Sequence, residues 1–502
     1  MRILNDCRAS VTGPIAVVGI LLLALAVRLY QLDLQVVWYD EAFSVWLARM
    51  PIDRAIYFTA QDVHPPLYYL LLHAWMTGFG DGVVAIRSLN VVLGVVTVAA
   101  GMLLAHRMAS RRIAVMAGLL LAMFPIAVYY SQEARMYGLL GLLMLSAAYM
   151  LLSWAQQQYS RYLLGYALLM IAGLYTHYFA ALGALVGWVY VLFARAPGGQ
   201  RLISMQRWWL CNLLIASAYL PWLPTLYGQV HENTGMVSWI APVTLVTLPQ
   251  SLWIAFMLGG DSSVMGIMTM VLTVLIFVAA ARAARQSKEP DKAGALLVIY
   301  CFVPVCVTWL FSFVLPLYVE RYLVFAFLGL PILLAVAMNG LRWKWQVTLL
   351  IACLFFEGVG LANLYNRAFN LRGGNEWVNN RLDYVMAQVA ARWQPGDALL
   401  TSDNAFWSLT IDFYNKTGSA PLVYSVGELD ADTLLYPSSL EHVVTEPRTL
   451  ASQYKRVWWV TSGEVTEIEK RMEQDWLKLE EVDKGDSRAL LFAMPEQSAR
   501  IN

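Results

Sequence analysis

Long, nearly uncharged hydrophobic segments recur along most of this chain, and they constrain its fold more than any other feature. A helix that crosses a lipid bilayer needs about 20 consecutive apolar residues. Such segments lie near residues 13–30, 83–105, 113–130, 137–155, 162–176, 178–194, 208–227, 264–281, 294–314, 322–340 and 346–364. The sequence therefore predicts a mostly α protein, built as a polytopic membrane helical bundle of about eleven transmembrane helices.

The composition agrees with a membrane protein. Of the 502 residues, 59% are hydrophobic and only 14% are charged, whereas soluble domains carry about 25% charged residues. The net charge of +1 and the lack of paired CxxC fingers give no reason to expect a nucleic-acid partner. The five cysteines lie in or beside hydrophobic segments, which favours packing over disulfide bonds. Ile15–Val27 alone could be a cleaved signal peptide, but the many later segments favour an uncleaved first helix.

Lysine and arginine residues gather at alternate ends of these helices. One side receives Arg2, Arg8, Arg107, Arg111, Arg112, Arg161, Arg195, Arg201, Arg207, Arg282, Arg285, Lys288, Lys292, Arg342 and Lys344. The other side receives Arg28, Arg49, Arg54, Arg135 and Arg321. Because cytoplasmic loops are richer in positive charge, we expect a cytoplasmic N-terminus and an external tail after residue 365.

The first external segment, residues 31–80, is neither a simple loop nor a clean span. Ala42–Ala60 has apolar residues at helical spacing and predicts a helix lying in the membrane interface. Pro65-Pro66 then predicts the start of a second helix, Leu67–Met76, since proline suits a first turn. Trp38, Trp46 and Trp75 are typical of the aromatic belt at headgroup level.

The tail, residues 366–502, is richer in charge and lacks long apolar runs. Helices are expected over Glu376–Trp393, Ala405–Tyr414 and Glu464–Trp476, and strands over Ala398–Thr401, Pro421–Ser425, Arg456–Thr461, Leu477–Val482 and Leu490–Met494. This alternation predicts a soluble α/β domain. No glycine-rich phosphate loop follows these strands, so nucleotide binding is not expected there. The expected organisation is a transmembrane catalytic domain, 1–365, and an extracytoplasmic domain, 366–502.

Polar residues at the expected external helix ends are the candidates for chemistry. Asp40 and Glu41 follow the first span, where they could cap a helix or serve as a catalytic pair. Glu133 and Arg135 lie in a very short external turn, where charges are costly unless they are paired or used. His64 precedes the rigid double proline, although a plain interfacial histidine is the alternative.

Two further external positions add candidates for binding. Arg321 opens the tenth span and could hold a phosphate, for which guanidinium is suited, or it could simply extend to the interface. His177 lies between two closely spaced helices. The predicted site is then catalytic Asp40, Glu41 and Glu133, with His64, Arg135, Tyr137, His177 and Arg321 binding substrate.

Four motifs together resemble a known group of membrane enzymes. They are Trp38-Tyr39-Asp40-Glu41, HPPLYYLLLHAW at 64–75, YYSQEARMYG at 129–138 and ERYL at 320–323. They resemble polytopic glycosyltransferases with the C-type membrane fold (GT-C), nearest the protein O-mannosyltransferase and lipid A aminoarabinose transferase branch. The tail resembles the external domain of bacterial members, which implies the bacterial inner (cytoplasmic) membrane as the location.

The resemblance implies a polyprenyl-phosphate-linked sugar as donor and an inverting transfer at the external membrane face. By matching position, Asp40 would be the first-loop catalytic carboxylate, Glu41 its neighbour, and Glu133 the second acidic position. His64 stands where some relatives carry a lysine. Some members bind a divalent metal through the acidic positions, so Asp40 and Glu133 could hold Mg²⁺, Mn²⁺ or Zn²⁺. The rival interpretations are a secondary transporter or lipid flippase, and a non-catalytic membrane subunit.

Overall fold

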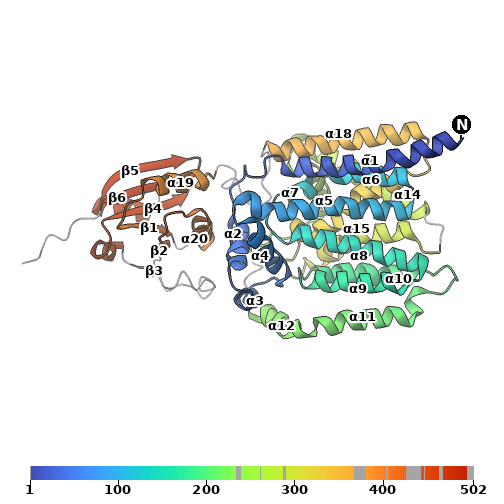
Figure 1. Cartoon of the computed structure of the whole chain (residues 1–502), viewed down its shortest axis with the longest axis horizontal. Coiled ribbons are helices and arrows are strands. Elements are labelled where there is room, and N and C mark those ends of the chain that lie inside the picture. The colour runs from blue at the N-terminus through green and yellow to red at the C-terminus, as the bar shows by residue number, and fades with distance from the viewer. Residues whose placement is uncertain are drawn as a thin grey trace, which may run out of the picture. The chain divides into compact units, whose positions relative to one another are not determined.

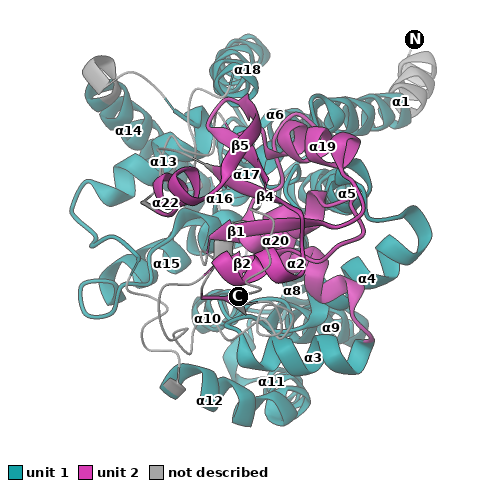
Figure 2. Ribbon diagram, turned by 90° about the vertical axis from the view of Figure 1, so that its left-hand side faces the viewer, with its two compact units in different colours: residues 1–32, 52–369 teal, residues 33–51, 370–502 magenta. Residues whose placement is uncertain are grey.

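The computed structural model divides into two compact units, coloured separately in Figure 2. Unit 1 comprises Met1–Leu32 and Ile52–Phe369, and unit 2 comprises Asp33–Pro51 and Asn370–Asn502. The structure describes residues 2–232, 239–259, 262–286, 290–366, 380–402, 405–424, 443–445, 447–462 and 467–493. Unit 2 therefore includes a short piece of the segment expected between the first two spans, as well as the tail.

Unit 1 is a helical bundle whose long helices run side by side (Figure 1). Its α-helices are α1 (Arg2–Leu29), α3 (Ile52–Gln61), α4 (Leu67–Phe79), α5 (Val83–Met108), α6 (Arg111–Met123), α7 (Pro125–Tyr129), α8 (Tyr137–Gln157), α9 (Ser160–Leu174), α10 (Ala180–Phe193), α11 (Gln206–Tyr219), α12 (Leu223–Glu232), α13 (Thr247–Met257), α14 (Ser262–Gln286), α15 (Ala293–Phe311), α16 (Val324–Phe327), α17 (Gly329–Ala337) and α18 (Trp343–Tyr365). Short 3₁₀ helices are η1 (Leu202–Ser204), η2 (Leu220–Trp222) and η4 (Glu320–Leu323).

The predicted polytopic membrane bundle is confirmed, whereas the count of eleven spans is not. Within the described residues, seven helical segments are long and apolar enough to cross a bilayer: Val83–Met108, Tyr137–Gln157, Gln206–His231, Gly266–Gln286, Ala293–Phe311, Glu320–Ala337 and Trp343–Tyr365. Three apolar helices are shorter: Gly13–Leu29, Ser160–Leu174 and Ala180–Phe193. The segment expected near 113–130 is divided into α6 and α7 at Pro125, which lacks the N–H that a continuous helix needs.

Proline also divides the interfacial helix expected over Ala42–Ala60. The structure has α2 (Tyr39–Arg49) and then α3, and the break falls at Met50 and Pro51. The second interfacial helix, α4, begins directly after Pro66 as expected. Helix α13 had no counterpart among the expected elements.

Unit 2 contains a six-stranded mixed sheet in the order β3-β2-β1-β4-β6-β5. The strands are β1 (Asp397–Ser402), β2 (Leu422–Tyr424), β3 (Val443–Val444), β4 (Arg456–Ser462), β5 (Leu477–Lys484) and β6 (Ser487–Ala493). The helical elements are α2, α19 (Leu382–Arg392), α20 (Ala405–Tyr414), η7 (Pro447–Ser452) and α22 (Glu467–Asp475). Strands β1, β2, β3 and β4 pair in parallel, while β6 runs antiparallel to both β4 and β5.

A hydrophobic cluster covers each face of this sheet. Trp459 lies in one cluster and Trp458 in the other, because successive side chains of a strand point to opposite faces. The first cluster includes Trp476, which directly follows α22, and the second includes Val385 of α19. The predicted α/β character of the tail is thereby confirmed, and the short edge strand β3 is the element that the sequence pattern missed.

Candidate active site

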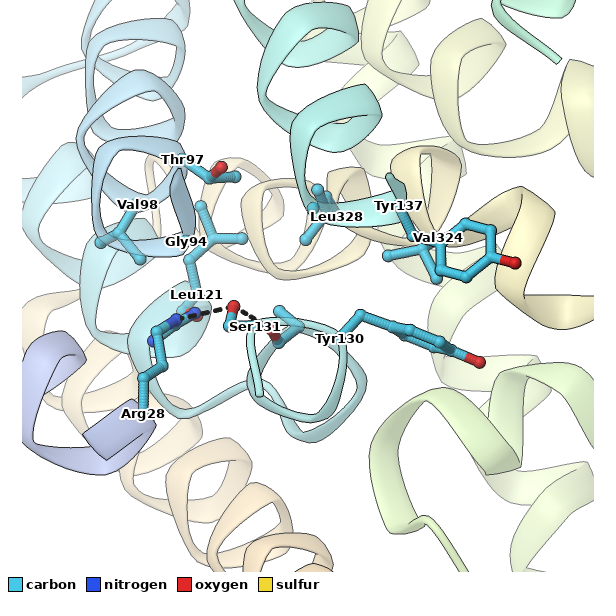
Figure 3. Close-up of a pocket in the computed structure, with 12 residues that line it drawn as sticks. Arg28, Gly94, Thr97, Val98, Leu121, Tyr130, Ser131, Tyr137, Val324 and Leu328 are labelled. Carbon is cyan, nitrogen blue, oxygen red and sulfur yellow. Dashed lines mark hydrogen bonds between the residues drawn. The ribbon is translucent and has the colours of Figure 1, made fainter. Parts of the chain in front are cut away.

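The turn between α7 and α8, which carries Glu133 and Arg135, is fastened to the end of α1. Arg28, almost fully buried, donates from Nε to Ser131 Oγ at 3.1 Å (Figure 3). It also donates from Nη1 to the Ala122 carbonyl at 3.0 Å. That carbonyl lies in the last turn of α6, where the break before α7 leaves acceptors without helical donors. Gln132 Nε2 in turn donates to the Arg28 carbonyl at 3.0 Å.

The packing around this contact leaves little free space. A Cβ at Gly94 of α5 would lie 2.3 Å from Ser131 Oγ and 2.6 Å from Arg28 Nε. The adjoining cavity, which Arg28, Ser131 and Tyr130 help to line, encloses about 20 Å³. Such a volume holds a water molecule but no sugar, and Arg28 is buried against the turn that it anchors.

Asn90 of α5 holds the same turn from the other side. Its Nδ2 donates to the backbone carbonyls of Glu133 and Arg135, the second at 2.7 Å. Asn90 is fully buried, and the side chains of Glu133 and Arg135 are 1% and 3% exposed. One amide group therefore fixes the backbone of two predicted site residues.

Two more segments with predicted site residues are joined by their backbones. The N–H of Leu67, at the start of α4, donates to the Tyr175 carbonyl at 2.9 Å. This bond places the segment that contains His64 beside the α9–α10 connection that contains His177. The two imidazole rings lie 5.4 Å apart between centroids, and both residues are buried.

Aromatic contacts extend this cluster to α8 and η4. The His177 ring lies 6.1 Å from the Tyr137 ring and 5.1 Å from the Tyr322 ring. The Arg135 guanidinium lies over Tyr137 at 5.9 Å, and that of Arg321 lies over Tyr322 at 5.5 Å. These contacts join all five predicted substrate-binding residues, which come from four parts of the sequence.

The cluster is cationic, and this affects the protonation of His177. Burial, followed by electrostatic interactions with His64, Arg135 and Arg321, holds the pKa of His177 well below its usual range. The His177 ring is thus neutral at physiological pH. Its Nδ1 accepts a hydrogen bond from the Phe179 N–H at 3.1 Å.

Asp40 and Glu41 lie in unit 2, in the first turn of α2. The N-cap position belongs to Trp38, without a side-chain cap, so Asp40 does not cap the helix. The Asp40 backbone carbonyl accepts from the Ser44 hydroxyl at 2.8 Å, and Glu41 is fully buried.

Helix α2 packs against α20 of the tail, and both ends of α2 are held there. The N–H of Val37, just before α2, donates to the Tyr414 phenol oxygen at 2.8 Å. At the other end, Arg49 lies 4.0 Å from the Asp412 carboxylate and 5.8 Å from the centre of the Phe413 ring. The tail therefore supports the helix that carries Asp40 and Glu41.

The possibility of a metal through Asp40 and Glu133 stays a prediction. These carboxylates lie in different units. Among the residues that the structure describes, no group of three or more histidine, cysteine, aspartate or glutamate side chains could hold a metal ion.

Sequence reasoning missed three residues that shape the site, namely Arg28, Asn90 and Asp62. Arg28 and Asn90 are polar residues within or at the end of hydrophobic segments, and such residues usually face the interior of a bundle and serve a purpose. Asp62 lies two positions before His64, and its Oδ2 is 3.3 Å from His64 Nδ1. The short separation of Asp62 and His64 in the sequence was the signal that could have identified Asp62.

Part of the chain matches a known family. Residues 63–224 match the model of the dolichyl-phosphate-mannose-protein mannosyltransferase family. This range includes His64, Glu133, Arg135, Tyr137 and His177. None of the curated proteins compared matches the chain.

Solved structures match over nearly the whole chain. ArnT from Cupriavidus metallidurans in the apo state has 16% identity and a TM-score of 0.67, covering 96% of this chain and 98% of ArnT. ArnT bound to undecaprenyl phosphate has 16% identity and a TM-score of 0.62, covering 95% and 97%. The oligosaccharyltransferase of Archaeoglobus fulgidus, in complex with Zn and sulfate, has 12% identity and a TM-score of 0.50, covering 88% and 67%.

These likenesses confirm the resemblance that the four motifs indicated. Together with the apolar helices, they show a multi-pass membrane protein with the GT-C fold, similar over residues 63–224 to the protein mannosyltransferase family and similar in its overall fold to ArnT.

Proposed function

We propose that the chain is an inverting glycosyltransferase that moves a hexosyl or pentosyl group from a polyprenyl-phosphate donor to an acceptor hydroxyl. The observation that carries the proposal is a cluster of five side chains at the ends of several helices, of which all but Arg321 are buried: His64, Arg135, Tyr137, His177 and Arg321. Cations and phenols so arranged suit a bound phosphate and sugar better than a lipid tail.

The proposed chemistry is a single displacement. A carboxylate, for which we propose Asp40, takes the proton of the acceptor hydroxyl, and the acceptor oxygen forms a bond to the anomeric carbon. The bond from that carbon to the phosphate oxygen breaks, and its electron pair stays on the departing polyprenyl phosphate. A positioned base contributes about 10²–10⁴-fold to such a step.

The leaving phosphate gains charge as the bond breaks, so fixed positive groups favour the transition state over the ground state. We assign this role to Arg135 and Arg321, whose guanidinium groups lie over Tyr137 and Tyr322. Glu41 and Glu133 complete the proposed acidic set, and Glu133 is held by the backbone contact from Asn90. ArnT, whose fold is similar, has been solved with undecaprenyl phosphate bound.

The proposal includes the place of the reaction. Residues 1–365 would form the catalytic domain of a bacterial inner-membrane protein with a cytoplasmic N-terminus. The site would lie at the external face, with residues 366–502 also outside. A glycolipid, a cell-wall glycan or a protein hydroxyl would be the acceptor.

Gene deletion and complementation test this function. Glycolipids, cell-wall glycans and glycoproteins of the deletion strain are compared by mass spectrometry with those of strains complemented by wild type, Asp40→Asn or Asp53→Asn. Asp53 is an exposed carboxylate in the first turn of α3, so its variant is a matched control. We expect one sugar to be missing in the deletion strain and restored by wild type and Asp53→Asn but not by Asp40→Asn.

Two outcomes would contradict the proposal. Full restoration by a stably produced Asp40→Asn would remove that residue from the chemistry. Movement of a sugar lipid across vesicles containing the purified protein, with no glycosidic product, would favour the transporter interpretation.

A further inference from the structure

Asp62 fixes the orientation and the tautomer of His64. The Asp62 carboxylate accepts from His64 Nδ1 at 3.3 Å, and the side chains of both are largely buried. Because Nδ1 then carries the proton, the neutral His64 ring presents the lone pair of Nε2 as a hydrogen-bond acceptor. Pro65 and Pro66 directly after His64 restrict the backbone that carries the ring.

The end of α3, which Asp62 directly follows, is itself held by hydrogen bonds. Gln229 Nε2 donates to the carbonyls of Thr59 and Ala60, at 3.1 Å each. The Tyr178 phenol, next to His177, donates to Gln229 Oε1. The Asp62–His64 pair and the His177 segment therefore belong to one hydrogen-bonded assembly.

His177 has the opposite tautomer. Its Nδ1 accepts from the Phe179 N–H at 3.1 Å, so the proton of the neutral ring lies on Nε2. That Nε2 is buried and has no hydrogen-bond partner among the described residues. A buried donor without a partner costs about 1–3 kcal/mol, and a ligand oxygen would remove this cost. The low pKa of His177, set by burial and by its cationic neighbours, keeps the ring neutral.

The two rings thus offer one acceptor and one donor at a centroid separation of 5.4 Å. A hydroxyl group is the common ligand group that can donate one hydrogen bond and accept another. Tyr137, Phe179 and Tyr322 surround His177 with aromatic rings.

We propose that His64 and His177 recognise one hydroxyl group of the sugar that the donor carries, with Asp62 as the positioning residue. Nε2 of His64 accepts from this hydroxyl, and Nε2 of His177 donates to its oxygen. The inference rests on the proposed function and deepens it, because it assigns the two histidines to the sugar and leaves the phosphate to the arginines.

Binding to lipids with and without the sugar tests this assignment. Full-length protein in nanodiscs is titrated with undecaprenyl phosphate and with undecaprenyl phosphates carrying mannose, glucose, galactose, N-acetylglucosamine or arabinose. The sugar lipid that wild type binds most tightly is the probe. We expect Asp62→Leu, which has no acceptor for Nδ1, and His177→Leu to bind the probe about tenfold more weakly, the usual size of a lost hydrogen bond. Their affinity for undecaprenyl phosphate should be unchanged.

Deoxy derivatives of the probe identify the hydroxyl. One monodeoxy derivative should bind to wild type about tenfold more weakly than the probe does. The two variants should bind this derivative and the probe with equal affinity. Asp62→Glu, which keeps the acceptor for Nδ1, should restore part of the discrimination. Asp53→Asn is the matched control and should behave as wild type, and thermal unfolding midpoints identify any variant that fails to fold.

The outcomes separate this inference from the proposed function. The folded variants could lose affinity equally for undecaprenyl phosphate and for the probe, or they could keep their affinity for both. In either case the assignment to a sugar hydroxyl is wrong while the proposed function stands. The assignment is also wrong if the variants distinguish every deoxy derivative from the probe as well as wild type does. If wild type binds no sugar lipid more tightly than undecaprenyl phosphate, the proposed function itself is contradicted.

Discussion

Replacing Asn90 by leucine would release the turn that carries Glu133 and Arg135. The Asn90 amide donates to the carbonyls of both residues, and all three residues are buried. Leucine has a similar volume but no donor, so two buried carbonyls would lose a partner. Side-chain hydrogen bonds within membranes contribute about 0.6 kcal/mol on average, and those in soluble proteins about 1 kcal/mol. Two bonds therefore give an expected loss of about 1–2 kcal/mol.

The loss should appear in both stability and turnover. Unfolding of the full-length protein in detergent micelles, followed by tryptophan fluorescence against denaturant, measures the first. Glycosyl transfer measures the second, and a displacement of about 1 Å of Glu133 or Arg135 can lower the rate about 10²-fold. Substrate affinity should fall less than the rate, since the other binding residues stay in place.

Thr97→Val on the same helix is the matched control. Thr97 is also buried, but its hydroxyl donates to the Leu93 carbonyl of α5 itself at 2.8 Å. This variant loses one hydrogen bond within a helix and leaves the turn untouched. If Asn90→Leu is as stable and as active as Thr97→Val, the amide does not hold the turn and the reasoning is refuted.

Three further variants test other contacts. In Gly94→Ala the new Cβ would collide with Ser131 Oγ and Arg28 Nε, so we expect a loss of about 1–3 kcal/mol in the same unfolding assay; Gly19→Ala, where nothing lies within 4 Å, should lose none. Tyr414→Phe removes the acceptor of the Val37 N–H, which should cost about 1 kcal/mol and speed hydrogen exchange of that amide; unchanged exchange would contradict the role of Tyr414. Burial raises the pKa of Asp412, so the unfolding free energy of unit 2 should fall as pH rises from the ordinary carboxyl pKa through the raised value. Asp412→Asn should remove this fall, and an identical pH dependence in both proteins would contradict it.

The sequence predicted the parts of the fold that depend on local pattern. Apolar runs located the helices of unit 1, and alternating elements located most of the sheet in unit 2. Errors occurred where one residue interrupts a run, as Pro51 does between α2 and α3 and Pro125 between α6 and α7. Proline removes one backbone donor without changing the hydrophobicity of the segment, so periodicity alone does not locate the break.

The distribution of lysine and arginine residues placed the candidate site residues at the same ends of the helices, and this part of the candidate site could be predicted from the sequence. His64, Tyr137, His177 and Arg321 lie far apart in the sequence, yet ring and cation contacts link them in the structure. The supporting residues were not predictable in this way. Asn90 acts on carbonyls 43 and 45 positions away, and nothing in its own segment indicates them.

The longest-range contact changes how the tail should be understood. Val37 and Tyr414 are 377 positions apart, yet their hydrogen bond and the Arg49–Asp412 contact hold α2 in the same compact unit as the sheet. Asp40 and Glu41 are therefore part of the unit that the C-terminal residues build. A truncation after residue 365 would remove the support of α2 together with the soluble domain. Loss of activity in such a truncation would therefore not show that the tail binds the acceptor, because a displaced Asp40 would have the same effect. Point variants at Tyr414 and Arg49, which leave the rest of the tail intact, separate these two roles.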